Sequence, residues 1–254
     1  MLKKENKNII IFISCSLLFI LLLVFVACIG NHQTLKYFEL NDKNEIQLKA
    51  EYIDIETLFG EERYTKEEIK KVKKFAKEYE VSPQEFVFVS LLTNGGYNLD
   101  FENVNKIKES IESLEKTYQK DISLIYEDHC KKDAYLDVIV RAKLSTKQEI
   151  MDKEVKIDGI LKFKKVAGIA DSGLLGADFE KITINDNIEK IGNNAFCNSF
   201  IQEIYLGKRT LVIGNDVLSH CNTIQHVYST RFLGEFTVGE NNDTFNDVFT
   251  FVEQ

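Results

Sequence analysis

The sequence predicts an α+β protein in which an N-terminal transmembrane helix, a small helical bundle and a short β-solenoid with a capping hairpin follow one another. Three observations lead to this prediction. There is an uncharged apolar stretch near the N-terminus, a long region with helical periodicity after it, and a sequence repeat of 22 or 23 residues towards the C-terminus. The expected divisions are an anchor at 1–30, a juxtamembrane segment at 31–64, a helical domain at 65–152, a repeat domain at 153–230 and a cap at 231–254.

The first element is the apolar stretch at 9–30, which is long enough to cross a membrane as a helix. Its 22 residues carry no charge, and at ~1.5 Å per residue they span about 33 Å, slightly more than the ~30 Å hydrocarbon layer. Lys3, Lys4 and Lys7 precede it. The positive-inside tendency therefore predicts a single-pass protein of the cell membrane, with a cytoplasmic N-terminus and an extracellular C-terminal region.

A bacterial lipoprotein signal is the alternative interpretation of the same stretch. The sequence Val24-Phe25-Val26-Ala27-Cys28 resembles a lipobox, in which Cys28 would be lipidated after cleavage. Phe25 stands where leucine is usual, and the apolar run is longer than a common signal peptide core. An uncleaved anchor is therefore the preferred prediction, and both interpretations leave the rest of the chain tethered outside the cell.

Composition favours folded domains and disfavours nucleic acid as a partner. The chain has 254 residues, 44% of them hydrophobic, which suffices for one large or two small domains with their own cores. Its formal net charge of -8 offers no general attraction for a phosphate backbone.

The cysteines and histidines indicate neither a disulfide framework nor a metal or cofactor site. Outside the apolar stretch only Cys130, Cys197 and Cys221 remain, and we expect them to be free and mostly buried, with a Cys197–Cys221 bridge as the alternative. His129 precedes Cys130, but no residue follows at a metal-ligand or catalytic spacing. We therefore predict no cofactor, no metal and no catalytic residue.

The helical domain is predicted from capping signals and apolar spacing. Thr65 and Glu68 have the spacing of a capping box, and Ser82-Pro83-Gln84-Glu85 repeats the device with proline at the first helical position. Residues 86–92 are apolar nearly all round, which predicts a helix buried in the middle of a small bundle.

The segment 81–98 loosely resembles the start of the lysozyme-like transglycosylase core. In that family a proline-capped apolar helix ends in a catalytic glutamate, whereas here the position falls on Thr93 or Asn94. Neither side chain can act as the general acid that glycoside cleavage requires. The resemblance would therefore imply a wall-facing protein that has lost catalysis, and an ordinary helix that ends at Gly95 is the alternative.

The repeat predicts a solenoid. When the sequence is aligned from Ile160, residues of the same character recur every 22 or 23 positions, which is typical of stacked turns that each contribute a short strand. The aligned apolar columns are Ile160, Ile182 and Ile204; Ile169, Ile191 and Ile213; Gly173, Ala195 and Val217; Leu174, Phe196 and Leu218; and Phe179 with Ile201.

The second turn, ITINDNIEKIGNNAFCNSFIQEIYL from Ile182, resembles the BspA-like leucine-rich repeat of bacterial surface proteins. The shared features are the strand, the Ile-Gly turn, the Ala-Phe pair and the returning apolar residue. The third turn fits with Val217-Leu218 for the Ala-Phe pair and Cys221 at an inward position. The resemblance implies a leucine-rich-repeat-like solenoid that takes part in adhesion or surface-protein binding.

Alternate residues of such strands face solvent, and these are the candidate ligand-binding residues. Two tyrosines among them suggest a recognition patch, because tyrosine offers a large contact area at little entropic cost, although strand propensity alone also places tyrosines there. The ligand would be a protein or a surface glycan. The predicted binding residues are Thr183, Asn185, Glu203, Tyr205, His226 and Tyr228.

Residues 231–254 are expected to cover the C-terminal end of the solenoid. Alternating stretches at 232–238 and 244–252, separated by Gly239-Glu240-Asn241-Asn242-Asp243, suggest a hairpin that caps the last turn. The leading hypothesis is a membrane-tethered bacterial surface protein whose repeats bind another macromolecule. The alternatives are a wall-associated protein with a degenerate lysozyme-like domain, and an extracellular scaffold or sensor for a membrane partner.

Overall fold

The computed structural model describes residues 32–60, 62–94, 99, 101, 103–148 and 152–253. The apolar stretch at 9–30 and the possible lipidation site Cys28 lie outside these ranges. Within the described ranges, no helix has both the length and the apolar character needed to cross a membrane.

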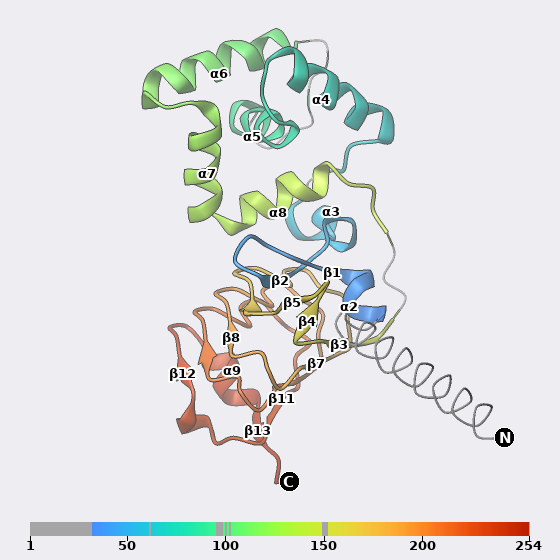
Figure 1. Ribbon diagram of the computed structural model, residues 1–254, viewed down its shortest axis with the longest axis vertical. Helices are drawn as coiled ribbons and strands as arrows, with labels where there is room; N and C mark the ends of the chain where they lie inside the picture. The colour runs from blue at the N-terminus through green and yellow to red at the C-terminus, as the bar shows by residue number, and fades with distance from the viewer. Residues whose placement is uncertain are drawn as a thin grey trace, which may run out of the picture.

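Figure 1 shows a helical region at one end of the molecule and a strand-rich solenoid at the other. The solenoid strands form two sheets. The six-stranded sheet has the order β1-β2-β6-β8-β10-β12, and the five-stranded sheet has the order β13-β11-β9-β7-β3. The first sheet consists of β1 (Phe38–Leu40), β2 (Glu45–Leu48), β6 (Gly168–Ile169), β8 (Lys190–Ile191), β10 (Val212–Ile213) and β12 (Thr237–Val238). The second consists of β3 (Glu154–Ile157), β7 (Lys181–Ile184), β9 (Glu203–Tyr205), β11 (His226–Ser229) and β13 (Phe249–Phe251).

The strand pairs of the solenoid are parallel apart from β1 with β2, as expected when successive turns stack in the same direction. Ile169 pairs with Ile191, and Ile191 with Ile213, so this predicted column is confirmed. The buried side chains of Leu174, Phe196 and Leu218 belong to the same core. The predicted helical region followed by a β-solenoid is therefore present.

The alignment of the first turn was wrong by several residues. Val155 pairs with Ile182 and Ile157 with Ile184, whereas Ile160 is 38% exposed on a separate hairpin. That hairpin consists of β4 (Ile160–Leu161) and β5 (Lys164–Lys165). It lengthens the first turn, so a constant period of 22 residues counted back from Ile182 misses the strand.

The tail also differs from the prediction, because it does not form a capping hairpin. β12 pairs in parallel with β10, and β13 pairs in parallel with β11. A short helix, α9 (Asp243–Val248), lies between β12 and β13 along the chain, and its Phe245 side chain is buried. The tail thus adds another turn to the solenoid. Alternating apolar residues suit parallel and antiparallel strands equally, so the pattern alone could not give the direction.

The segment 31–64, expected to be juxtamembrane, contributes to the first turn of the solenoid. β2 pairs in parallel with β6, and the ring of Phe38 lies 5.9 Å from that of Phe179. The helical region is therefore inserted between β2 and β3 along the chain. The remaining elements of this segment are α2 (His32–Tyr37), η1 (Ala50–Tyr52) and α3 (Ile55–Phe59).

Glycine permits the close stacking of successive turns. A Cβ atom at Gly192 would lie 2.6 Å from the carbonyl carbon of Ala170 in the preceding turn, and one at Gly214 would lie 2.6 Å from that of Gly192. Such contacts are too short for a side chain. The Ile-Gly turn of the repeat is therefore required by the approach of one backbone to the next.

The helical region has its own core around the predicted buried helix. Four consecutive residues of that helix are fully buried: Phe86, Val87, Phe88 and Val89. The predicted capping box is also present, because the Thr65 side chain accepts the Glu68 N–H and the Glu68 carboxylate accepts the Thr65 N–H. The helices are α4 (Lys66–Glu78), α5 (Pro83–Asn94), α6 (Asn105–Tyr118), α7 (Ile122–Lys132) and α8 (Ala134–Lys143).

Helix α8 and Arg63 connect the helical region to the solenoid. Val138 and Ala142 of α8 belong to the solenoid core, whereas Val140 belongs to the helical core. The Arg63 guanidinium donates to Ala142 O at 2.7 Å and to Ala50 O at 3.2 Å, and also bonds Ile53 O. One side chain thus joins the end of α8 to the segment that follows β2.

Candidate binding surface

The outward side of the five-stranded sheet gathers most of the predicted binding residues. Pairing aligns Thr183 with Tyr205 and Tyr205 with Tyr228 on neighbouring strands. Their strand neighbours Ile182, Ile204 and Val227 are buried, which directs the intervening side chains outward. We call this surface the outer face. Its members are Glu154, Lys156, Lys181, Thr183, Glu203, Tyr205, His226, Tyr228 and Thr250.

An aromatic cluster occupies the middle of the outer face. The ring centroids of Tyr205 and Tyr228 are 4.6 Å apart with an interplanar angle of 30°. The imidazole of His226 stacks on Tyr228 at 5.2 Å, and the Lys181 ammonium lies 4.7 Å from the centre of the Tyr205 ring. Much of the ring surface is therefore already in contact within the cluster, and the half-buried tyrosines present their remaining edges to solvent.

Charges of alternating sign run beside this cluster. In-register pairing places Glu154, Lys181 and Glu203 in one row across three strands, and the imidazole of His226 continues the row on β11. The Tyr205 hydroxyl donates to Glu203 Oε2 at 3.0 Å, and Lys181 Nζ lies 3.9 Å from Glu154 Oε2. Burial and, next, the bond to Glu203 raise the pKa of Tyr205 to about 12, so this phenol remains a hydrogen-bond donor at neutral pH.

Five of the six predicted binding residues lie together on the outer face, and Asn185 serves a different purpose. It follows the last residue of β7, and its side-chain oxygen accepts the Asn187 N–H at 3.0 Å. This bond stabilises the turn after the strand. Four residues of the outer face were not predicted from sequence: Glu154, Lys156, Lys181 and Thr250. Extending the two-residue alternation back from Thr183 would have identified Lys181.

Helix α2 lies along the β3 edge of this sheet. At the β3 edge, Gln33 Nε2 donates to Glu154 O at 2.9 Å, and Gln33 Oε1 accepts the Lys156 N–H at 3.1 Å. Thr34 Oγ1 donates to Lys156 O at 3.0 Å. Helix α2 thus covers this edge with side-chain hydrogen bonds, which is one way that proteins prevent edge-to-edge association.

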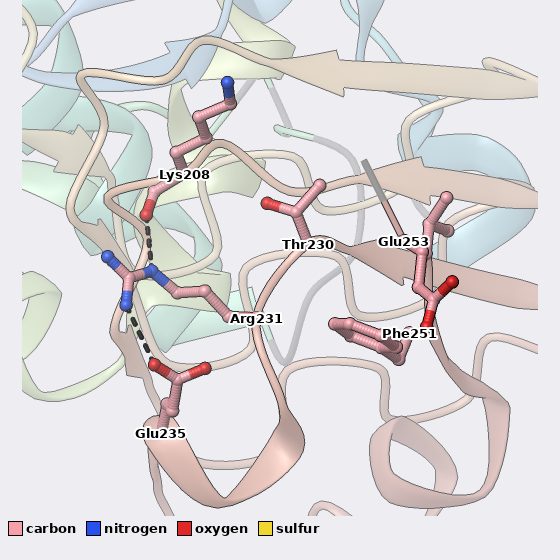
Figure 2. A pocket seen from close by; sticks show the side chains of 7 residues that line it. Lys208, Thr230, Arg231, Glu235, Phe251 and Glu253 are labelled. Carbon is pink, nitrogen blue, oxygen red and sulfur yellow. Dashed lines mark hydrogen bonds and ion pairs between the residues drawn. The ribbon is translucent and has the colours of Figure 1, made fainter.

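A hollow of about 500 Å³ lies at the C-terminal end of the solenoid, beside β13 (Figure 2). Arg231 is the central charged residue there. Its guanidinium lies 3.1 Å from Glu235 and donates to the Lys208 carbonyl at 2.5 Å. The Arg231 charge is therefore already paired with a carboxylate of the same chain. Figure 2 shows Phe251 and Glu253 on the opposite wall. Apolar and oppositely charged groups are mixed in this hollow, which gives it no clear preference for one ligand class.

The thiols and His129 are held in structural contacts. Cys130, Cys197 and Cys221 are free, in agreement with the preferred prediction. Burial and, next, the Asp137 charge raise the pKa of the Cys130 thiol to about 12, which makes it a poor nucleophile. The His129 ring lies 5.4 Å from that of Phe88. In the described part of the chain, no group of three or more His, Cys, Asp or Glu residues could hold a metal ion.

The predicted lysozyme-like position lies at the end of α5. The Thr93 hydroxyl donates to Val89 O at 2.9 Å, which is a common contact inside a helix. Residues 95–98 lie outside the described ranges. No comparison with known proteins supports this resemblance.

Comparison with known proteins identifies the repeats. Searches of curated proteins and of solved structures found no match. Residues 161–239 match the family model described as a BspA type leucine rich repeat region (6 copies). The match covers the turns from β4 to the loop after β12. It confirms that the C-terminal repeats of this chain resemble the BspA type of leucine-rich repeat.

Proposed function

We propose that this chain is a membrane-tethered bacterial cell-surface protein that binds another protein through the outer face of its repeats. The observation that supports this most directly is the Tyr205–Tyr228 cluster, flanked by Lys181 and Glu203, on strands whose inward residues Ile182, Ile204 and Val227 are buried. Leucine-rich repeats of this type are generally implicated in surface interaction or binding. The chain would therefore act by binding.

The geometry favours a protein over a glycan as the ligand. A sugar ring binds aromatic side chains by lying flat on an exposed ring face, but here the faces of Tyr205 and Tyr228 contact each other, His226 and Lys181. Ring edges, hydroxyl groups and charges of alternating sign remain for contact. Such a surface suits a protein partner with complementary charges around a central aromatic contact.

The proposed tether is the uncharged stretch at 9–30, preceded by three lysines. It would leave the repeats outside the cell, and lipidation at Cys28 remains the alternative attachment. Protease added to intact cells should degrade the repeats and leave a small N-terminal fragment. Complete protection of the repeats would contradict the tether, and release or altered mobility of a Cys28→Ala variant would favour lipidation.

The binding test compares the full chain with variants expressed at the same level on cells. Partners are cross-linked to the wild-type protein, identified by mass spectrometry, and then measured individually for binding. Tyr205→Ala and Tyr228→Ala together should weaken binding at least about tenfold, because interface tyrosines are often worth ~2 kcal/mol or more.

The matched control is Tyr118→Ala. This tyrosine is 50% exposed on α6, outside the solenoid. Its replacement should leave binding unchanged. A partner that the double variant retains, or that Tyr118→Ala loses equally, would remove the outer face from consideration. Thermal melting of each variant checks that it remains folded.

A further inference from the structure

Helix α4 concentrates positive charge in a chain whose net charge is -8. Six of its 13 residues are lysines, and all six are exposed. Three glutamates lie on the same helix, so it retains an excess of positive charge. The lysines are Lys66, Lys70, Lys71, Lys73, Lys74 and Lys77.

Four of these lysines form a continuous stripe. Lys66, Lys70, Lys73 and Lys77 follow one another at intervals of four, three and four residues, which places them on one side of a helix. At ~1.5 Å per residue the stripe is about 16 Å long. Within it, the ion pair of Lys70 with Glu67 at 2.9 Å is highly exposed and is therefore weak.

Part of this stripe lines a concave site. A hollow of about 540 Å³ lies between α4 and the segment after α8, with Lys66, Lys70 and Lys73 on one wall. Thr146 and Gln148 are on the other wall and offer hydroxyl and amide donors. The lysines and these neutral donors thus border the same space.

The second wall is fixed in place by bonds from neighbouring segments. The Gln148 N–H donates to Glu51 O at 2.7 Å, and the Arg63 guanidinium donates to Ser145 Oγ at 2.9 Å. Glu51 is the one acidic residue among those that line the hollow. Since Glu67 also pairs with Lys70, three ammonium groups stand against two carboxylates, and the site keeps a net positive charge.

We propose that this hollow binds a linear polymer that carries repeated phosphate groups. Ammonium groups together with hydroxyl and amide donors suit phosphate oxygens, and a stripe of about 16 Å exceeds what a single phosphate group can contact. A concave site between two walls fits a chain better than a flat lipid surface. The apolar residues that line it, such as Ile69, are not among the exposed large hydrophobic side chains that would insert into a bilayer.

The test measures binding of fluorescently labelled linear sodium polyphosphate to the full chain, purified in a non-ionic detergent. The variant replaces Lys66, Lys70 and Lys73 with glutamine, which has a similar helix propensity. We expect its affinity to fall at least about tenfold at physiological salt. The slope of log affinity against log salt is negative, and its magnitude should fall by about two, since three charges no longer release counterions.

The matched control replaces Lys106, Lys108 and Lys116 of α6 with glutamine. These lysines are also exposed and lie on another helix of the helical region, and because three lysines are replaced in each variant, the change in net charge is identical. The control should bind polyphosphate with nearly wild-type affinity. Circular dichroism melting curves confirm that both triple variants are folded.

Several results would overturn the proposal. They are the absence of polyphosphate binding by the wild-type chain at physiological salt, equal weakening by the two triple variants, and inorganic phosphate competing as strongly as the polymer at equal phosphate concentration. Binding to phosphatidylglycerol vesicles that depends on Lys66, Lys70 and Lys73, without such dependence for polyphosphate, would assign the stripe to a lipid surface instead.

Discussion

Ile157 and Ile160 can be used to test which residues form the inner strand of the first turn. The structure places Ile157 there, whereas a constant repeat period places Ile160 there. The 22-residue alignment places Ile160 in the buried strand column with Ile182. In the structure, Ile157 occupies the inner side of β3, pairs with Ile184 and is fully buried. Replacing each isoleucine with alanine removes the same atoms from two very different environments.

The expected costs follow from burial. Ile→Ala deletes three carbon atoms, and at ~0.8 kcal/mol per buried carbon the transfer contribution is about 2.4 kcal/mol. The cavity left at Ile157 raises this towards 3 kcal/mol or more, within the ~2–5 kcal/mol seen for such changes. Ile160 is 38% exposed on a two-stranded hairpin that can relax, so Ile160→Ala should cost about 1 kcal/mol.

Equilibrium urea unfolding of the purified full chain, followed by circular dichroism and tyrosine fluorescence, measures both costs. The dependence of the unfolding free energy on urea must be the same in both variants for the comparison to hold. If Ile160→Ala proves as costly as Ile157→Ala, or more so, then the first turn has the register of the constant period and the observed β3–β7 pairing is refuted.

Three further changes test other parts of the molecule. In urea unfolding, Phe245→Ala should destabilise the solenoid by about 3–5 kcal/mol and Phe251→Ala by about 1 kcal/mol, because Phe245 is 1% exposed and Phe251 37%. Equal costs of the two substitutions would mean that the tail does not pack as an added turn. At pH 8, iodoacetamide should label Cys130 about 1000-fold more slowly in the folded chain than in the unfolded one, since a raised pKa reduces the thiolate fraction. Cys221, whose pKa burial also raises, should be slow as well, and peptide mass spectrometry that finds rapid labelling of folded chain would contradict this. Arg63→Lys should cost about 2–3 kcal/mol in urea unfolding, because one ammonium cannot reach the carbonyls that the guanidinium fork joins, and a cost below ~0.5 kcal/mol would show that this connection is unimportant.

The repeated turns could be predicted from sequence because each occupies the same environment. Ile191 and Ile213 pair in register and face one core, so selection for an apolar side chain acts alike on both positions. A period is informative only while the turns have equal length. The β4–β5 hairpin adds residues to the first turn, and the apolar alternation of the tail does not distinguish parallel from antiparallel pairing.

The contribution of β2 to the first turn was missed because β2 and β6 are far apart in sequence. Ile46 on β2 pairs with Ile169 on β6, with the whole helical region between them. Residues 45–48 form one short strand, too brief to show a repeat on its own. A capping signal such as that of Thr65 is local and was therefore predicted correctly.

The outer face was largely predictable because alternation in a strand is a local property. Tyr205 and Tyr228 were predicted to face outward because the apolar residues next to them, Ile204 and Val227, were expected to face the core. Their mutual contact was not, since it depends on the register between β9 and β11. Asn185 obeys the same alternation but follows the end of β7, where the side chain is free to form a turn.

The position of α2 has a consequence for a tethered protein. This helix directly follows the apolar stretch in sequence and covers the β3 edge through Gln33 and Thr34. β13 lies at the other edge, four strand spacings or about 19 Å away. A tether attached through α2 would therefore hold the β3 edge nearest the membrane. Tyr205 and Tyr228, on the strands between, would lie progressively farther from it, with the outer face open to a partner that approaches from the side.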